Sequence, residues 1–432
     1  MGQLVMLKTN FMHNESHKNE LNLKVFFILV TFSLLLISDR DLRFSLSFYQ
    51  YPAFNTILSV LSIVLGTFIL YRRSWIIDSV VVLLIMRTCL SIVTMMLMSH
   101  SFYASGKALC VLLVSILAYY VFLNKSKYLS LKSFSTLISL YLLVLSIQTI
   151  GSYYVNSTNN LVYAKSLVEI PIGRSNFIAT HMLVCIVFLF YVKNKTKLHN
   201  IALTLGAIAL LLTMSFGALI AAISISLIKT IFFYGGSKIK QVMILLSLSM
   251  VLLYSVSIYF PSYNYEEDSL TSSINRNIST KLTYFIEGNY DRLFSDRFLV
   301  YSEAWSRFLS SPVIGTFEGV NFREKTNVRA HNLFLESLSK YGIFGFVTLL
   351  IPIVIVLKRM VLILKNQRWS DGVYACFFAL MVGVIHGLVE PNFFSLEFEF
   401  LWWSIAGFSV SQVKSVAFLS RSRGIQKARL CL

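Results

Sequence analysis

The segment WIIDSVVVLLIMRTCLSIVTMMLM, residues 75–98, carries only two charged side chains, Asp78 and Arg87. An α-helix rises about 1.5 Å per residue, so a run of this length can cross a bilayer core of roughly 30 Å. Similar apolar runs recur from residue 24 to residue 413. Hydrophobic residues make up 56% of the chain and charged residues 13%, against about 45–50% and about 25% in soluble domains. The sequence therefore predicts an all-α, polytopic integral membrane protein.

The apolar runs predict about twelve transmembrane helices. The expected spans are Lys24–Ser38, Phe54–Tyr71, Trp75–Met98, Ala108–Leu123, Phe134–Ile150, Asn176–Val192, Ile201–Ser215, Ala218–Phe233, Val242–Phe260, Ile343–Leu357, Val373–Leu388 and Phe398–Val413. Together they form one membrane domain over residues 24–413. A cytoplasmic segment, residues 1–23, is expected before it, and a basic cytoplasmic tail, residues 414–432, after it. We expect the first span to be retained, because no small-residue cleavage site follows its apolar run.

The formal net charge of +18 comes from short clusters of Lys and Arg between the apolar runs. Nucleic-acid binding is not indicated, because such proteins present a continuous basic face or stripe. With twelve spans, the clusters all fall on one side of the membrane, as the positive-inside rule requires. Both termini are therefore expected in the cytoplasm.

Two segments then lie outside the membrane, Gly151–Ser175 and the large loop Pro261–Ala330. Within the large loop, Asp291–Ser311 has the apolar spacing of an amphipathic helix. Arg297 borders the apolar face of this helix, whereas Arg307 is expected to point away from it. The apolar face is formed by Phe294, Phe298, Tyr301, Trp305 and Phe308.

A group of polar residues closes the large loop, at Arg329-Ala330-His331-Asn332. Gly342 follows at the start of the tenth expected span. A histidine at the membrane boundary is suited to proton transfer near neutral pH. The alternative is that His331 and Asn332 only cap a helix and that the glycine only allows helices to pack. The spacing alone leaves these two interpretations equally open.

Ionisable residues in the spans give a second set of candidates. Asp78 and Arg87 are nine residues apart, on opposite faces of one helix, and cannot pair with each other. Ionisable residues within a span are usually functional, but a structural partner on another helix is the favoured alternative. His386 and Glu390 are one helical turn apart, before Pro391. They either line one cavity or hydrogen-bond to each other, and the second is favoured.

The order of these motifs resembles the O-antigen polymerase and O-antigen ligase superfamily of bacterial envelope glycan assembly. His331-Asn332, followed by nine residues and Gly342, is similar to the ligase-type pattern. Arg297 ahead of Ser311-Pro312-Val313-Ile314-Gly315 looks like the family's arginine and Pro-x-x-Gly turn. Ile172-Gly173-Arg174-Ser175-Asn176 looks like its Gly and Asn element before a middle span. Where ligases carry an arginine after a Thr-x motif, this chain reads Thr213-Met214-Ser215-Phe216-Gly217-Ala218, and arginines in two external loops are more typical of the polymerases.

The resemblance implies a metal-independent glycosyltransferase without a cofactor, in the inner membrane of a bacterium. Its donor would be an undecaprenyl-diphosphate-linked glycan. The acceptor would be a lipid-linked repeat unit for a polymerase, which is favoured, or lipid A core or a protein for a ligase. A chain-length regulator or a flippase would be its protein partner. A transporter is the alternative of another class, but matching broken helices in the two halves are not found.

The expected roles follow from the chemistry of each side chain. His331 is expected to act as the base, because its ordinary pKa of about 6.5 lies near working pH. Arg174 and Arg297 are expected to hold the diphosphate, because the guanidinium forms bidentate, permanently charged hydrogen bonds. The residues expected to bind substrate are Asn332, Arg329, Asn176 and Gly342.

Overall fold

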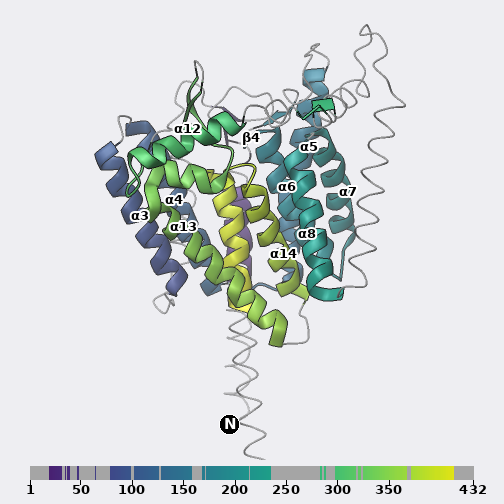
Figure 1. The fold of residues 1–432 in the computed structure, drawn as a ribbon. Helices are drawn as coiled ribbons and strands as arrows, with labels where there is room; N and C mark the ends of the chain where they lie inside the picture. Colours follow the sequence, from purple (N-terminus) through teal and green to yellow (C-terminus); the bar gives the residue numbers. More distant parts are fainter. Residues whose placement is uncertain are drawn as a thin grey trace, which may run out of the picture.

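The structure is a computed structural model of the 432-residue chain. It describes residues 19–31, 78–98, 102–125, 128–157, 168–170, 172–213, 215–234, 297–317, 320–322, 325–366 and 371–412, and short stretches at 35, 37–38, 46–47, 64, 283–284 and 287–288. The described part is a bundle of long helices (Figure 1).

The expected spans that fall on described residues are helical over most of their length, but the end of Lys24–Ser38 is not, because Ile37–Ser38 form a short strand, β1. The helices are 19–31, α3 (Ser79–Met98), α4 (Phe102–Lys125), α5 (Leu131–Ser157), α6 (Ser175–Tyr191), α7 (Lys197–Leu212), α8 (Phe216–Tyr234), α13 (Leu333–Asn366), α14 (Asp371–Gly387) and 396–412. The expected spans Phe54–Tyr71, apart from Val64, and Val242–Phe260 lie outside the described residues. The count of twelve spans and the side on which the termini lie therefore stay predictions.

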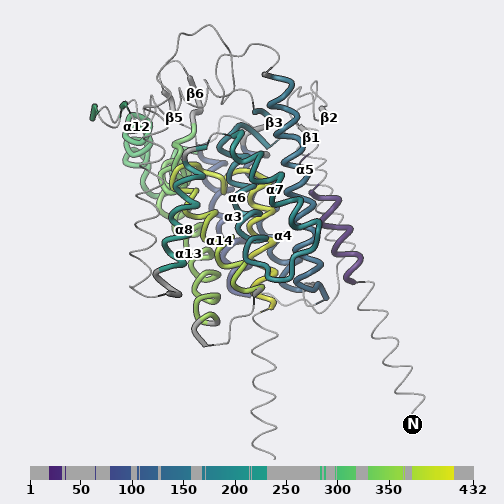
Figure 2. The backbone as a smooth tube through the Cα atoms, turned by 90° about the vertical axis from the view of Figure 1, so that its right-hand side faces the viewer, coloured from purple at the N-terminus to yellow at the C-terminus, as the bar shows by residue number. Residues whose placement is uncertain are grey.

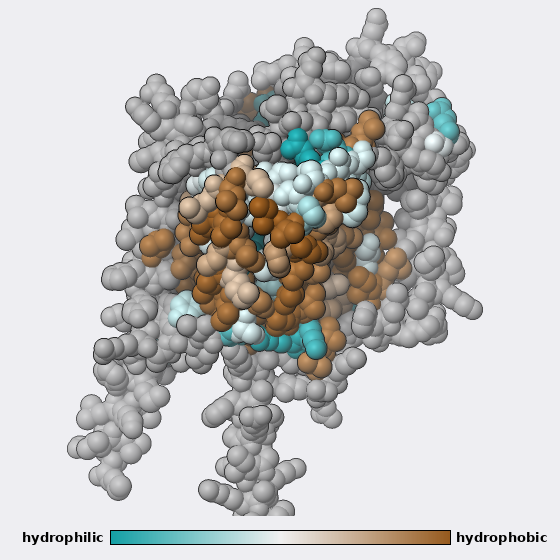
Figure 3. Space-filling view, turned by 60° about the vertical axis from the view of Figure 1, so that its left-hand side comes forward, coloured by the Kyte–Doolittle hydropathy of each residue, from teal (hydrophilic) through white to brown (hydrophobic). Residues whose placement is uncertain are grey.

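Three described helices are long and apolar enough to cross a membrane, within Ser79–Met98, Leu131–Asn156 and Leu333–Leu362. Their outward side chains are apolar, for example Met96 on α3, which is 80% exposed, and Val354 on α13. Figure 3 shows such side chains as a brown band between more hydrophilic rims. An exposed apolar surface of this extent is typical of contact with lipid. The prediction of a membrane protein is thus supported by the surface as well as by the sequence.

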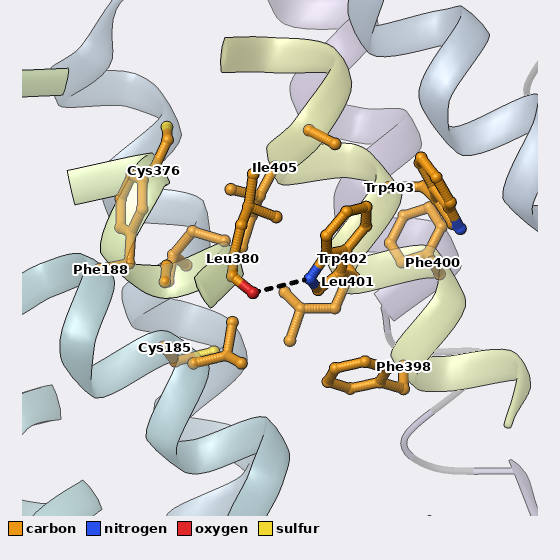
Figure 4. Close-up of a cluster of buried hydrophobic side chains, with 14 of the residues drawn as sticks. Cys185, Phe188, Cys376, Leu380, Phe398, Phe400, Leu401, Trp402, Trp403 and Ile405 are labelled. Carbon is orange, nitrogen blue, oxygen red and sulfur yellow. Dashed lines mark hydrogen bonds between the residues drawn. The ribbon is translucent and has the colours of Figure 1, made fainter. Parts of the chain in front are cut away.

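The helices of the bundle contact one another in several neighbouring groups. α3 contacts α4 and α13, α5 contacts α6 and α7, and α14 contacts α6 and α8. Aromatic side chains of helix 396–412 fill the space between α6 and α14 (Figure 4), where Trp402 Nε1 donates to Leu380 O at 3.1 Å. Trp402 and Phe398 are fully buried. This helix is therefore the central element of the core.

Two ion pairs connect helices within the bundle, one fully buried and one partly exposed. Arg87 on α3 donates to Glu399 Oε1 at 3.0 Å, and Glu399 also accepts from Ser115 Oγ at 2.7 Å. Asp78 pairs with Arg359 of α13 at 2.6 Å. Ionisable groups among helices require such partners, because an unpaired charge there is very unfavourable. The prediction that Asp78 and Arg87 have partners on other helices is confirmed.

Smaller elements gather at one end of the bundle (Figure 2). A hairpin of β3 (Glu169–Ile170) and β4 (Gly173–Arg174) precedes α6, and a hairpin of β5 (Val320–Phe322) and β6 (Lys325–Val328) precedes α13. A further two-stranded sheet pairs β1 (Ile37–Ser38) with β2 (Leu46–Ser47). In the sequence, α12 (Arg297–Ser310) comes between β4 and β5. It lies across the end of the bundle and contacts α13.

The buried face of α12 differs from the expected one. Val300 and Ala304 are the buried positions, whereas Trp305 is 46% exposed. Arg297 and Arg307 lie on the same stripe as the buried pair, at spacings of three and four residues. The prediction that Arg307 points away from the packed face is therefore wrong. The reason is that the small side chains of Val and Ala fit closely against Ala330 and Leu335. The sequence pattern instead favoured the bulky aromatic face as the packed one.

Candidate active site

His331 and Glu390 form the centre of the candidate site. His331 Nδ1 lies 3.1 and 3.2 Å from the two carboxylate oxygens of Glu390. The carboxylate is buried, at 2% exposure, whereas the imidazole is 35% exposed. A histidine oriented by a buried carboxylate and still open on one side has the arrangement of a general base.

The backbone of His331 is held in a left-handed conformation, with φ of 51°. Few residues other than glycine adopt this region, and such positions cluster at functional sites. Asn332 explains the turn, because its Oδ1 accepts from the backbone N of Phe334 and Leu335 and so caps α13. Asn332 Nδ2 also donates to Leu388 O at 3.0 Å. Asn332 thus fulfils the capping alternative, while the His331 side chain does not cap the helix and points to Glu390.

Glu390 lies in the turn after α14, outside the helices. Burial raises the pKa of its carboxyl, but the hydrogen bond and charge of His331 and the charge of Arg297 lower it more, so the net pKa is below the ordinary value. The carboxylate is therefore ionised at neutral pH and accepts a hydrogen bond from the protonated Nδ1 of His331. This leaves Nε2 as the nitrogen that can accept a proton from a substrate.

Asn176 fixes the other side of the carboxylate. Its Nδ2 donates to Glu390 Oε2 at 3.1 Å, and its Oδ1 accepts from Ser215 Oγ at 3.0 Å. Asn176 lies in the first turn of α6, and Ser215 lies in the break between α7 and α8. A continuous chain of hydrogen bonds therefore runs from Ser215 through Asn176 and Glu390 to His331, and it joins four separate parts of the sequence.

Arg297 reaches this group from α12. Its Nη1 donates to the backbone oxygen of Val389 at 3.1 Å, next to Glu390. Arg307, in contrast, donates to Glu303 Oε1 at 3.0 Å within the same helix. Ten residues along a helix correspond to about 15 Å, so the two arginines serve different places. Only Arg297 is brought to the His331–Glu390 pair.

Gly342 lies at a kink in α13, where its φ is 62°. A Cβ at this position would lie 2.3 Å from Val313 O. Ile343 N donates to Pro312 O at 2.8 Å, and a Cβ on Gly315 would likewise meet the backbone of α13, at Lys340. The two glycines thus allow the Pro-x-x-Gly turn to lie directly against the kink, and the structure gives Gly342 this packing contact.

The two remaining arginines of the predicted site have different surroundings. The Arg174 side chain is 72% exposed and lies 3.4 Å from Glu169 on the β3–β4 hairpin. Arg329 is half-buried, and its guanidinium carbon lies 4.7 Å from the centre of the Phe177 ring. Phe177 follows Asn176, so Arg329 is held against the element that positions Glu390.

The sequence reasoning did not pair Glu390 with His331. It favoured a hydrogen bond between Glu390 and His386. The backbones form one, since Glu390 N donates to His386 O at 3.0 Å, but the His386 side chain has other neighbours, with Nδ1 2.8 Å from Thr180 Oγ1 and 3.2 Å from Asn392 Nδ2. The helix ends at Gly387 and Glu390 lies in the turn that follows, where its carboxylate contacts His331 and not the His386 side chain. Pro391 was the available signal, because proline favours a helix end before it.

No group of three or more His, Cys, Asp or Glu side chains that could hold a metal ion occurs among the residues that the structure describes. A mechanism without metal remains a prediction. Among the residues that the structure describes, His331 contacts the carboxylate of Glu390, and Arg297 lies beside that carboxylate at Val389.

Comparison with known proteins finds a family match for part of the chain. Residues 201–350 match the family model described as O-antigen ligase. The matched part contains Arg297, Arg329, His331 and Gly342, while Glu390 lies beyond it. No curated protein matches the chain. The match and the apolar helices support a membrane protein of envelope glycan assembly, and the family implies lipid-linked glycans as the general kind of substrate. The match over residues 201–350 thus supports a relationship of the chain to the superfamily of O-antigen polymerases and ligases.

Proposed function

We propose that the protein is a polymerase that transfers an undecaprenyl-diphosphate-linked glycan onto a lipid-linked repeat unit at the outer face of the bacterial inner membrane. The observation that carries the proposal is the pairing of the exposed His331 with the buried Glu390, beside Arg297. This arrangement supplies the two requirements of glycan transfer from a diphosphate, which are a base for the acceptor and a cation for the leaving group.

In the proposed reaction, a hydroxyl of the acceptor attacks the anomeric carbon of the donor. The new C–O bond forms as the bond between that carbon and the diphosphate oxygen breaks. The hydroxyl proton passes to His331 Nε2, and undecaprenyl diphosphate leaves. Negative charge grows on the departing diphosphate, and Arg297 stabilises that charge by hydrogen bonding. Arg174, on its exposed hairpin, stays the second predicted diphosphate ligand.

Ligation to lipid A core is the second candidate. The family model that matches residues 201–350 is that of an O-antigen ligase, which favours this reading. The absence of an arginine in Thr213-Met214-Ser215-Phe216-Gly217-Ala218 favours the polymerase. Both enzymes use the same donor, so the acceptor decides between them.

Deletion of the gene distinguishes the two candidates. For a polymerase, we expect surface glycan on a gel to collapse to single repeat units attached to core. Uncapped core together with stored lipid-linked polymer would instead identify a ligase. Unchanged glycan would contradict both. Complementation with the wild-type gene is the control for each result.

The proposed reaction requires the His331 end of the bundle to face away from the cytoplasm. Reporter fusions after Lys240 and Arg368 are expected to read cytoplasmic, and fusions near Asn160 and Ser295 external. The physical reason is the retention of Lys and Arg clusters on the cytoplasmic side. Alkaline phosphatase and green fluorescent protein fusions measure this, and an external signal at Arg368 contradicts the proposed topology.

A further inference from the structure

Among the described arginines of the candidate site, Arg329 makes the fewest hydrogen bonds. The side chain is half-buried and stacks on Phe177, at 4.7 Å from the ring centre. Its Nη1 is buried and has no hydrogen-bond partner. A buried polar group without a partner is unfavourable, more so when it carries a charge, and such groups require an explanation.

The neighbouring carboxylate does not supply this partner. The charge of Arg329 acts on Glu336. However, Glu336 Oε1 pairs with Lys340 Nζ at 2.7 Å, and Glu336 Oε2 accepts from the backbone N of Ala330 at 2.6 Å. Glu336 Oε2 is therefore hydrogen-bonded to the backbone, and Oε1 is in an ion pair with Lys340 rather than with Arg329. The guanidinium of Arg329 can therefore donate hydrogen bonds to another anion.

The position of Arg329 suits the anion nearest the reaction centre. Two residues span at most about 7 Å, so Arg329 lies close to His331 along the chain. In the proposed reaction, His331 contacts the acceptor hydroxyl, which attacks the carbon that bears the donor diphosphate. The acceptor's own diphosphate lies at the far end of its repeat unit. The donor diphosphate is therefore the group that Arg329 can meet.

We propose that Arg329 is a ligand of the donor's lipid-linked diphosphate and acts with Arg297. This inference rests on the proposed function and deepens it. Arg297 is anchored on α12 and Val389, and Arg329 on α6 through Phe177, so the two guanidinium groups approach from different elements. Two forks match two phosphates, because each guanidinium binds one phosphate bidentately. Arg174, which pairs with Glu169 at 3.4 Å and is largely exposed, has the weaker claim to this role.

Binding of farnesyl diphosphate to the purified full-length protein tests the proposal without depending on transfer. We expect Arg329→Ala to weaken this binding about 10- to 100-fold, the usual effect of losing hydrogen bonds to a charged group. Binding of farnesol, which lacks the diphosphate, should be unchanged. Arg329→Lys keeps the charge and the contact with the ring but loses the fork, so it should bind farnesyl diphosphate with intermediate affinity.

Arg307→Ala is the matched control, because Arg307 is bound to Glu303. Inorganic pyrophosphate forms a second arm, which separates recognition of the phosphates from recognition of the lipid. Unchanged binding of farnesyl diphosphate by Arg329→Ala would overturn the proposal. Equal weakening of farnesol binding, or a larger loss in Arg174→Ala, would overturn it as well. Failure of the proposed function would appear differently, as diphosphate binding without glycan transfer by the wild-type protein.

Discussion

Replacement of His331 by alanine is expected to slow glycan transfer by about 10²–10⁴-fold, the usual contribution of a general base. The imidazole is the partly exposed member of the pair with Glu390, and its Nδ1 is occupied by the carboxylate at 3.1 Å. Only Nε2 is then suited to accept the acceptor's proton. The measurement is the rate of polymer formation in membranes that contain equal amounts of each variant.

A second variant separates the loss of the base from a loss of structure. His331→Ala leaves the buried Glu390 with one partner fewer, which is destabilising. His331→Gln can still donate to Glu390 but has no basic nitrogen, so it should be as inactive as alanine and more stable to heat. Near wild-type transfer by the glutamine variant would remove His331 from the proton transfer, and Asn332 alone would explain the motif as a helix cap.

Replacement of Arg297 by alanine is expected to lower transfer by about 10²–10³-fold, because preorganised donors at a developing charge have effects of this size. Its guanidinium is fixed beside the catalytic pair by the hydrogen bond to Val389 O. Arg297→Lys keeps the charge but loses the planar fork, so it should still lose most of the activity. The rate of transfer and the affinity for the lipid-diphosphate donor measure these effects.

Arg307→Ala is the control for Arg297, because both lie on the same stripe of α12. Arg307 is paired with Glu303 within the helix, and such a pair contributes less than about 1 kcal/mol to stability. Activity should therefore stay within about tenfold of wild type. A greater loss in Arg307→Ala than in Arg297→Ala, at equal protein level, would show that α12 presents the wrong arginine to the site.

The sequence predicted most of the apolar helices that the structure describes, because the length of an apolar run indicates them directly. The expected start of the tenth span at Ile343 lies one residue after the kink at Gly342. The break between α7 and α8 was also expected, around Phe216 and Gly217. Helix ends were less certain, and α5 continues to Ser157 rather than ending at Ile150.

The contacts of the site could be predicted only in part. Asn176 and His331 were expected as site residues, but not that both would bind the same carboxylate of Glu390. Sequence spacing relates residues within one helix, whereas these three come from segments up to 214 residues apart. The prediction of which face of α12 is packed was wrong for a related reason. The fit of Val300 against the start of α13 depends on tertiary packing, which sequence spacing does not show.

The most direct test of the central claim measures donor affinity and single-turnover transfer on the same purified His331→Gln protein. The His331–Glu390 pair is proposed to move a proton and not to hold the donor. The account therefore predicts donor affinity within a few-fold of wild type, together with a transfer rate lower by about 10²–10⁴-fold. Transfer at the wild-type rate, or a loss of donor binding that accounts for the whole defect, would contradict it.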